Sequence, residues 1–254
     1  MELVDVHAHL AAPEFANDLP EVLARAEKAG VRGIVTVGEA LEDSERILAL
    51  SARHPLIRPA AGLHPTRLDP EAAEAVLAFA RRNSDRLVAL GEVGLDHWAV
   101  KAEADWEIQD AILVKFIILS NELGIPLSVH SRSAGRHTIA LLKTHDARRA
   151  LLHAFDGKAA TALEGVEAGY CFSIPPSVVR SPQKQKLVRR LPLASLLLET
   201  DSPALGPTPA ERNEPANVVI ACRTVADLKG VPPDTVARVT TENAARLFPR
   251  LFAM

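Results

Sequence analysis

The chain has 254 residues, of which 48% are hydrophobic and 24% charged, and its net charge is −3 at pH 7. This composition excludes a disordered chain and is enough for a sizeable core. The slight negative charge excludes a surface that coats nucleic acid broadly, but it is compatible with a small basic site for phosphates. The chain has only two cysteines, no secretion signal and no run of roughly 20 apolar residues. We therefore expect a cytoplasmic protein that is not embedded in a membrane and needs no obligate protein partner.

Short apolar runs alternate with amphipathic segments along the whole chain. The apolar runs predict strands at residues 3–9, 32–38, 56–62, 87–93, 125–130, 149–154, 169–174 and 195–200. The segments between and after them predict helices at residues 13–30, 42–53, 70–83, 103–123, 134–144, 159–168, 183–191, 213–229 and 234–248.

Eight alternations of strand and helix, without a linker or a change in composition, indicate parallel strands joined by crossovers. Eight such units close a barrel. We therefore predict an α/β fold: a single-domain TIM (β/α)8 barrel over residues 1–254, with an additional C-terminal helix at 234–248. A doubly wound open sheet is the alternative, although it would gather ligands at one crevice rather than from nearly every strand.

Residues that can bind a metal ion stand at the ends of several predicted strands. In a parallel barrel all strands end at the same mouth, where the active site is built, so these side chains should converge on one pocket. The candidate metal ligands are His7, His9, Glu92, His130, His153 and Asp201.

Each candidate also has an ordinary structural explanation. His7 and His9 lie two residues apart and so share one face of a strand, but an isolated pair could also be a core histidine and a loop cap. Glu92 lies between two glycines in GEVGLD, where it could bridge two cations or pair with a Lys or Arg. Asp201 follows the apolar run LLLET, so either a cation or an Arg must neutralise it.

The kind of donor indicates the kind of cation. Imidazole and carboxylate ligands together suit Zn²⁺, Mn²⁺ or Fe²⁺, and carboxylates with water also admit Mg²⁺. His130 and His153, which singly would be core histidines, make a second metal position together with Glu92. Six ligands predict two divalent metal cations (Zn, Mn or Mg) about 3.5–4 Å apart, a pair that hydrolyses phosphodiesters, esters or amides.

A set of longer motifs runs in order along almost the whole chain: His7-Ala-His9, GLHP, GEVGLD, VHSR, LHAF and ETDSP, with SIPPSVVRS, QKQKLV and RNEP among or after them. This set resembles the TatD family of metal-dependent deoxyribonucleases, a branch of the amidohydrolase superfamily, and within it the subfamily called TatD DNase domain containing three. The resemblance implies a TIM barrel with one metal held by His7, His9, Glu92 and Asp201, and the other by Glu92, His130 and His153.

The same resemblance assigns the catalytic residues. Glu92 would bridge the metals in place of a carboxylated lysine, and Asp201 would accept the proton of the attacking water. Two departures from the family pattern concern substrate loops: GLHPT lacks a second histidine after the proline, and DHW stands where many relatives have an aromatic pair. Neither departure affects a metal ligand.

Candidate substrate contacts follow the predicted strand ends. His64 could hold a phosphate oxygen, or it could orient the turn at Pro65. Ser131 and Arg132 come directly after the fifth predicted strand, and a guanidinium there suits a bidentate phosphate contact. A salt bridge from Arg132 to Asp156 is the alternative.

Other side chains near the predicted mouth could contact a nucleic-acid strand. Trp98, in the loop after Glu92, could stack on a base. Several cations could track a backbone, although QKQKLVRR is also typical of the solvated face of a helix. These cations are Arg136, Lys158, Arg180 and Lys184.

Together these features predict a metal-dependent hydrolase of phosphodiester bonds. The residues alone indicate only a two-metal hydrolase; the family resemblance implies a 3′-5′ exonuclease with single-stranded DNA as its nucleic-acid partner. An ester or amide hydrolase, such as a D-aminoacyl-tRNA deacylase, is the alternative, because the same activated water would serve it. A barrel that only binds a partner is disfavoured, since it needs no bridging carboxylate and proton acceptor together.

Overall fold

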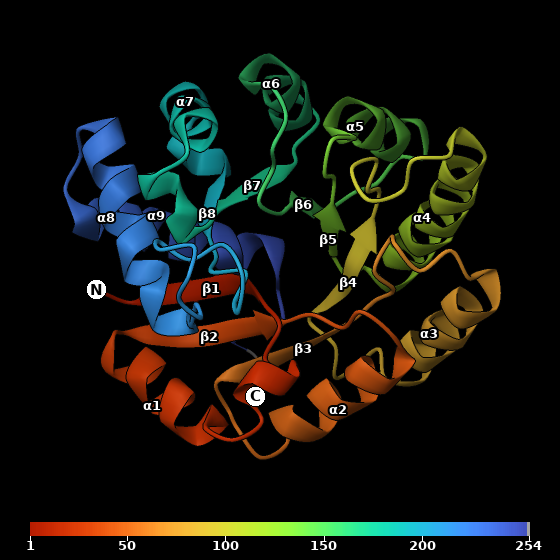
Figure 1. The fold of residues 1–254 in the computed structure, drawn as a ribbon, viewed down its shortest axis with the longest axis horizontal. Helices are drawn as coiled ribbons and strands as arrows, with labels where there is room; N and C mark the ends of the chain where they lie inside the picture. The colour runs from red at the N-terminus through yellow and green to blue at the C-terminus, as the bar shows by residue number, and fades with distance from the viewer. Residues whose placement is uncertain (253–254) are drawn as a thin grey trace.

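Eight parallel strands follow one another around a barrel in the computed structural model, which describes residues 1–252. Each strand pairs with the next one in chain order, and the helices form a ring outside them (Figure 1). The strands are β1 (Leu3–Ala8), β2 (Val31–Thr36), β3 (Ile57–Ala61), β4 (Ala89–Gly94), β5 (Leu127–His130), β6 (Ala150–Leu152), β7 (Cys171–Ile174) and β8 (Leu196–Leu198). The predicted TIM barrel is confirmed, and the open-sheet alternative is wrong.

Amphipathic helices connect the strands and cover the barrel. In the first of them the buried positions recur at helical spacing, which gives it one apolar face toward the strands. The helices are α1 (Leu19–Lys28), α2 (Leu41–Ser51), α3 (Pro70–Arg82), α4 (Glu103–Leu123), α5 (Gly135–Thr144), α6 (Ala159–Glu167), α7 (Pro182–Arg190), α8 (Val218–Lys229) and α9 (Pro233–Leu247). Within residues 1–252, none of the helices is both long and apolar enough to cross a membrane.

Backbone hydrogen bonds join the first strand to the segment that follows the last one. The N–H of Asp201 donates to the carbonyl of His7 at 2.8 Å, and the N–H of His9 donates to the carbonyl of Ser202 at 2.8 Å. Both bonds lie at the mouth end of β1. The closure of the barrel therefore holds two segments with predicted ligands side by side.

The apolar core has an outer and an inner part. The outer part lies between the strands and the helices. The inner part fills the barrel with residues such as Val6 and Leu197, and α9 with the chain after it closes the floor through Leu247, Phe248 and Leu251. The additional C-terminal helix is thus confirmed, and truncating the fully buried Phe248 to alanine should cost about 3–5 kcal/mol of stability. With the floor filled, the mouth is the open end.

Two predicted helices are interrupted at their starts. Residues 13–30 do not form one helix, because the 3₁₀ helix η1 (Pro13–Phe15) ends before α1 begins. Pro20 lies in the first turn of α1, where backbone N–H groups have no partner within the helix. A proline, which lacks this N–H, is therefore tolerated there and marks the true start of the helix. Residues 213–229 likewise begin with the 3₁₀ helix η4 (Pro215–Asn217) before α8.

The sixth and eighth strands are shorter than predicted. Ala154 adopts a left-handed backbone conformation, with φ of 43°, and such a residue cannot continue an extended strand. In the eighth strand, Ser195 belongs to a 3₁₀ helix and the strand ends at Leu198. Two short 3₁₀ helices that the sequence analysis did not predict also occur, η2 (Pro176–Val179) and η3 (Leu193–Ser195).

Candidate metal centre

A β-bulge in β1 brings two histidines to the mouth of the barrel. Between Asp5 and Ala8 the strand has one residue more than the matching stretch of β2. An extra residue of this kind re-aims the side chains beside it. At this end of β1, Nε2 of His7 lies 3.3 Å from Nε2 of His9.

Four side chains form the first donor group: His7, His9, Glu92 and Asp201. Oδ1 of Asp201 is 3.6 Å from Nε2 of His7 and 3.2 Å from Nε2 of His9. Oε2 of Glu92 is 3.6 Å and 3.4 Å from the same two nitrogens. Ligands about 2.0–2.2 Å from a tetrahedral cation stand roughly 3.4 Å from one another. The spacing and the chemistry of these donors therefore fit one divalent cation.

Three side chains form the second donor group: Glu92, His130 and His153. Oε1 of Glu92 is 2.5 Å from Nδ1 of His130 and 2.7 Å from Nε2 of His153. The two nitrogens are 3.3 Å apart, and Nε2 of His64 is 4.0 Å from the same oxygen of Glu92. Three converging donors could hold a second cation and leave coordination positions open for water and substrate.

Glu92 offers one carboxylate oxygen to each donor group. Burial alone would raise the pKa of Glu92, but the neighbouring His153 and His130 hold it well below its usual range, so the group is ionised. Close packing of β4 against β5 places it there, since a Cβ on Gly94 would collide with the backbone of His130. Glycine at this position is thus a local requirement of the site.

The outer ring nitrogens of two histidines have hydrogen-bond partners that orient them. Nε2 of His130 lies 3.0 Å from Oδ2 of Asp96, and Nδ1 of His7 lies 2.9 Å from Oγ of Ser128. Partners of this kind fix the tautomer and the ring plane of a metal-binding histidine. Each ring thereby directs its other nitrogen toward Glu92.

Glu199 is a buried carboxylate next to the centre that the sequence analysis did not single out. It accepts hydrogen bonds from the N–H of Ala154 at 2.8 Å and from Oγ of Ser173 at 2.5 Å. Its Oε2 lies 3.9 Å from Nδ1 of His153, and burial raises its pKa to about 7. Its signal was present in LLLETD, where a second carboxylate directly follows the apolar run.

Asp5 is a second buried carboxylate that sequence reasoning missed. Its Oδ1 accepts from the N–H of Thr200 at 2.9 Å and its Oδ2 from Oγ1 of Thr200 at 2.5 Å, which ties β1 to the residue before Asp201. Burial raises the pKa of Asp5 to about 8. An aspartate inside the apolar run VDVH was the available signal.

The histidines of the centre differ in protonation. Burial lowers the pKa of His7 to about 4, so its ring is neutral, which is the form that binds a metal. Burial alone would also lower the pKa of His9 and His130, but nearby carboxylates raise these values to about 9 and about 10. Cation binding at these two rings must therefore displace protons.

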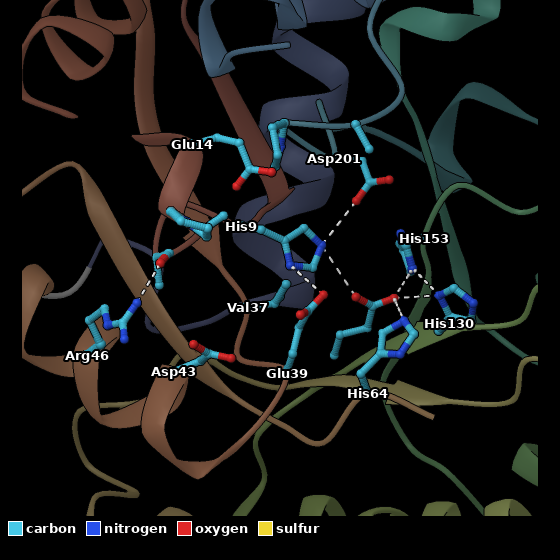
Figure 2. A pocket seen from close by; sticks show the side chains of 16 residues that line it. His9, Glu14, Val37, Glu39, Asp43, Arg46, His64, His130, His153 and Asp201 are labelled. Atoms are coloured by element: carbon cyan, nitrogen blue, oxygen red, sulfur yellow. Dashed lines mark hydrogen bonds and ion pairs between the residues drawn. The ribbon is translucent and has the colours of Figure 1, made fainter. Parts of the chain in front are cut away.

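Two cavities open beside the donor groups. The first cavity, of 510 Å³, lies on the side of β1 and α2 and is drawn in Figure 2. The second cavity, of 430 Å³, lies on the side of β5 and β6. Both cavities reach His130, His153 and Asp201. Five of the six predicted ligands line a cavity, whereas His7 is fully buried beneath them.

His64 combines the two arrangements that the sequence analysis considered. Its Nδ1 lies 2.7 Å from Oγ1 of Thr66, which orients the turn after β3. Its Nε2 faces the second donor group and lines the first cavity (Figure 2). The side chain is therefore held by the turn and can still reach a ligand in the cavity.

Ser131 and Arg132 line the second cavity. The guanidinium of Arg132 lies over the ring of Trp98, 3.6 Å from its centroid, and forms a cation–π contact. The alternative salt bridge to Asp156 is not formed; Asp156 instead accepts from the backbone N–H of Ser133 at 3.0 Å. Trp98 thus holds Arg132 at the rim of the cavity.

The other cations expected near the mouth have diverse environments. Lys184 is buried, lines the second cavity and donates from Nζ to the carbonyl of Ala154 at 2.9 Å. Nη2 of Arg180 contacts the carbonyl of Gly206 at 3.3 Å. Lys158 lines a separate cavity between α6 and α7. Arg136 is an exposed residue of α5.

An eight-stranded barrel with imidazole and carboxylate donors gathered at its mouth is the arrangement of a metal-dependent hydrolase. Residues 4–249 match the family model described as TatD related DNase. The chain therefore belongs to the TatD family, and the family resemblance drawn from its motifs is confirmed.

Individual relatives support this membership. The chain is 48% identical over 262 residues to deoxyribonuclease TATDN3 of Homo sapiens, with 98% of this chain and 95% of that protein covered. It is 34% identical over 254 residues to the uncharacterized metal-dependent hydrolase YabD of Bacillus subtilis, with 97% and 98% covered. The crystal structure of YjjV, a TatD homolog from Escherichia coli K12, superimposes with a TM-score of 0.90 at 29% identity, covering 97% of this chain and 98% of that one.

Proposed function

We propose that this protein is a 3′-5′ exonuclease that hydrolyses phosphodiester bonds at the ends of single-stranded DNA with two divalent cations in its metal centre. The observation that carries the proposal is Glu92, whose Oε2 faces the first donor group and whose Oε1 faces the second. A carboxylate shared in this way suits a pair of cations. When bound, Zn²⁺, Mn²⁺ or Mg²⁺ would polarise the phosphoryl group and supply a water of lowered pKa.

Asp201 is suited to accept the proton of the attacking water. Burial alone would raise its pKa, but the hydrogen bond with His9 lowers it, so the carboxylate is ionised at neutral pH. Its side chain borders both cavities and can be reached from either side. The oxygen of water forms a bond to phosphorus, the bond to the O3′ of the preceding nucleotide breaks, and that oxygen takes a proton from solvent.

Three side chains around the centre are suited to hold the substrate. His64 faces the second donor group from the first cavity, and Ser131 and Arg132 line the second. A guanidinium can form two hydrogen bonds to a phosphate at once. Its stacking on Trp98 limits the conformations of Arg132 before substrate binds.

A strand end fits the site better than a duplex does. Each cavity has a size typical of small-molecule sites, so it suits about one nucleotide. Tight duplex binding needs many phosphate contacts, and few cations border the cavities.

DNA is the proposed substrate because the family model and the relative TATDN3 are named for this activity. We expect no protein partner, and we place the activity in the cytoplasm because Cys171 and Cys222 are buried thiols rather than a disulfide.

The test compares a linear single strand with a closed circle of the same sequence, each incubated with the protein and Mn²⁺, Mg²⁺ or Zn²⁺. We expect stepwise shortening of the linear strand from its 3′ end and no cleavage of the circle. Equal cleavage of the circle would show that no free end is needed. A D-aminoacyl-tRNA in a parallel reaction addresses the alternative, since its deacylation without DNA cleavage would identify an ester hydrolase instead.

A further inference from the structure

The first cavity has an acidic wall. Apart from residues of the two donor groups, Glu14, Glu39 and Asp43 line it together with one guanidinium, that of Arg46. Nη1 of Arg46 donates to the carbonyl of Ala11 at 3.0 Å. In the view of Figure 2, Glu39 and Asp43 lie between Arg46 and the histidines of the centre. The wall next to the metal centre therefore has an excess of negative charge.

The second cavity has a basic wall. Besides residues of the two donor groups, which include Asp201, it is lined by the cations Arg132 and Lys184 and by the carboxylate of Asp156. Asp156 also lines an adjoining cavity of 750 Å³ between α6 and α7, to which three further cations contribute: Lys158, Lys186 and Arg190. Cations thus continue from the metal centre toward α6 and α7, whereas carboxylates dominate the opposite side.

Resting on the proposed nuclease function, we infer that the strand enters over the second cavity and that the first cavity receives the terminal nucleoside, where it selects a 3′-hydroxyl end over a 3′-phosphate end. The phosphates of the strand body favour the basic side, because cations replace their counterions. Beyond the scissile bond, a nucleoside with a 3′-hydroxyl adds no further charge.

A 3′-phosphate would bring negative charge against Glu39 and Asp43. Like charges placed opposite each other at an interface are strongly unfavourable, and they also slow association. Glu39 and Asp43 therefore act as specificity-determining residues for the end of the strand. The selection concerns the chemistry of the terminus and not the base, since the repelled group is the phosphate.

The experiment uses the metal-loaded protein and two oligonucleotides of one sequence, labelled at the 5′ end, which finish in a 3′-hydroxyl or a 3′-phosphate. For the parent protein we expect kcat/KM on the 3′-hydroxyl strand to exceed that on the 3′-phosphate strand by at least about tenfold. In Glu39→Gln/Asp43→Asn this ratio should fall below about threefold, because the repulsion is removed. Because the ratio is taken within one enzyme, a change in metal affinity caused by losing the contact of Glu39 with His9 affects both strands alike.

The matched control is Glu42→Gln/Glu45→Gln, which removes two exposed charges of α2, the helix of Asp43, that do not line the cavity. It should keep the parent ratio. Equal rates of the parent protein on both strands would overturn the inference and leave the nuclease function standing. An unchanged ratio in the Glu39→Gln/Asp43→Asn variant would overturn the assignment to these two carboxylates. No cleavage of either strand would instead overturn the proposed function itself.

Discussion

Asp96 accepts a hydrogen bond from Nε2 of His130 at 3.0 Å, and this contact turns Nδ1 of the ring toward Glu92. Burial alone would raise the pKa of Asp96, but its hydrogen bonds with His130 and with backbone N–H groups lower it to about 2. The carboxylate is therefore ionised at neutral pH. It can select one tautomer of His130 and so prepare the second donor group for a cation.

Asp96→Asn should weaken metal binding at the second donor group. An amide keeps the shape of the side chain but loses the charge that orients and polarises His130. We expect metal affinity there to fall about 10–100-fold, measured by competition with a chelator. Asp85→Asn, at an exposed residue after α3, is the control and should bind metal like the parent. Parent-like affinity in Asp96→Asn would mean that the contact does not prepare the site.

Asp201→Asn should abolish most of the activity while the fold is kept. The amide cannot accept the proton of the attacking water, and it is a poorer ligand than the carboxylate. We expect kcat to fall by at least about 10²-fold, with circular dichroism unchanged. A folded variant that cleaves at the parent rate would rule out the proposed proton acceptor.

Arg132→Ala should lower kcat/KM for the substrate without loss of metal. The guanidinium lines the second cavity but belongs to neither donor group. Removing a hydrogen bond to a charged group should lower kcat/KM about 10–100-fold. Trp98→Ala should show a smaller effect in the same direction, because the ring holds Arg132 in place. Arg223→Ala, at an exposed cation of α8, serves as the control. Loss of metal from Arg132→Ala would contradict this division of roles.

Asp5 should make the stability of the protein depend on pH. Burial raises its pKa from 3.8 to about 8. Between these values the folded state binds a proton that the unfolded chain has released, so stability falls as pH rises through this range. The stabilising contribution is complete below pH 3.8 and is lost as pH rises through about 8.

Asp5→Asn cannot titrate, and its amide can still hydrogen bond with Thr200. The free energy of unfolding of this variant, relative to the parent, should therefore increase between about pH 5 and about pH 8.5. Urea unfolding measures this difference in free energy, and a chelator in the solution removes the pH dependence that metal binding would add. A difference that stays constant across this range would show that Asp5 does not titrate as described.

The sequence predicted the barrel well because two regular patterns coincide in it. Apolar runs that alternate with helical periodicity specify parallel strands, and polar ligands at the ends of several runs specify the mouth. His9, Glu92 and His130 could be placed together on this basis, since topology alone brings strand ends to one face. The starts of α1 and α8 were misplaced because helical periodicity outweighed the proline signals at Pro20 and Pro215.

The features that the sequence did not predict depend on contacts between segments far apart in the chain. The pairing of Asp5 with Thr200 spans the closure between β1 and the segment after β8, and a single run of residues cannot show it. Trp98 and Arg132 lie on different loops, so their stacking could not be predicted from either loop. Likewise, the different charges around the two cavities become visible only when α2, the loop after β5 and α7 are placed around the same centre.

The metal content of Glu92→Gln shows whether one carboxylate serves two cations, because Glu92 alone belongs to both donor groups. The measurement is elemental analysis of the parent protein, Glu92→Gln and His153→Ala after identical metal loading and desalting. We expect two cations per chain in the parent, loss from both positions in Glu92→Gln, and loss mainly from one position in His153→Ala. Two tightly bound cations retained by Glu92→Gln would show that Glu92 is not shared between two metal positions.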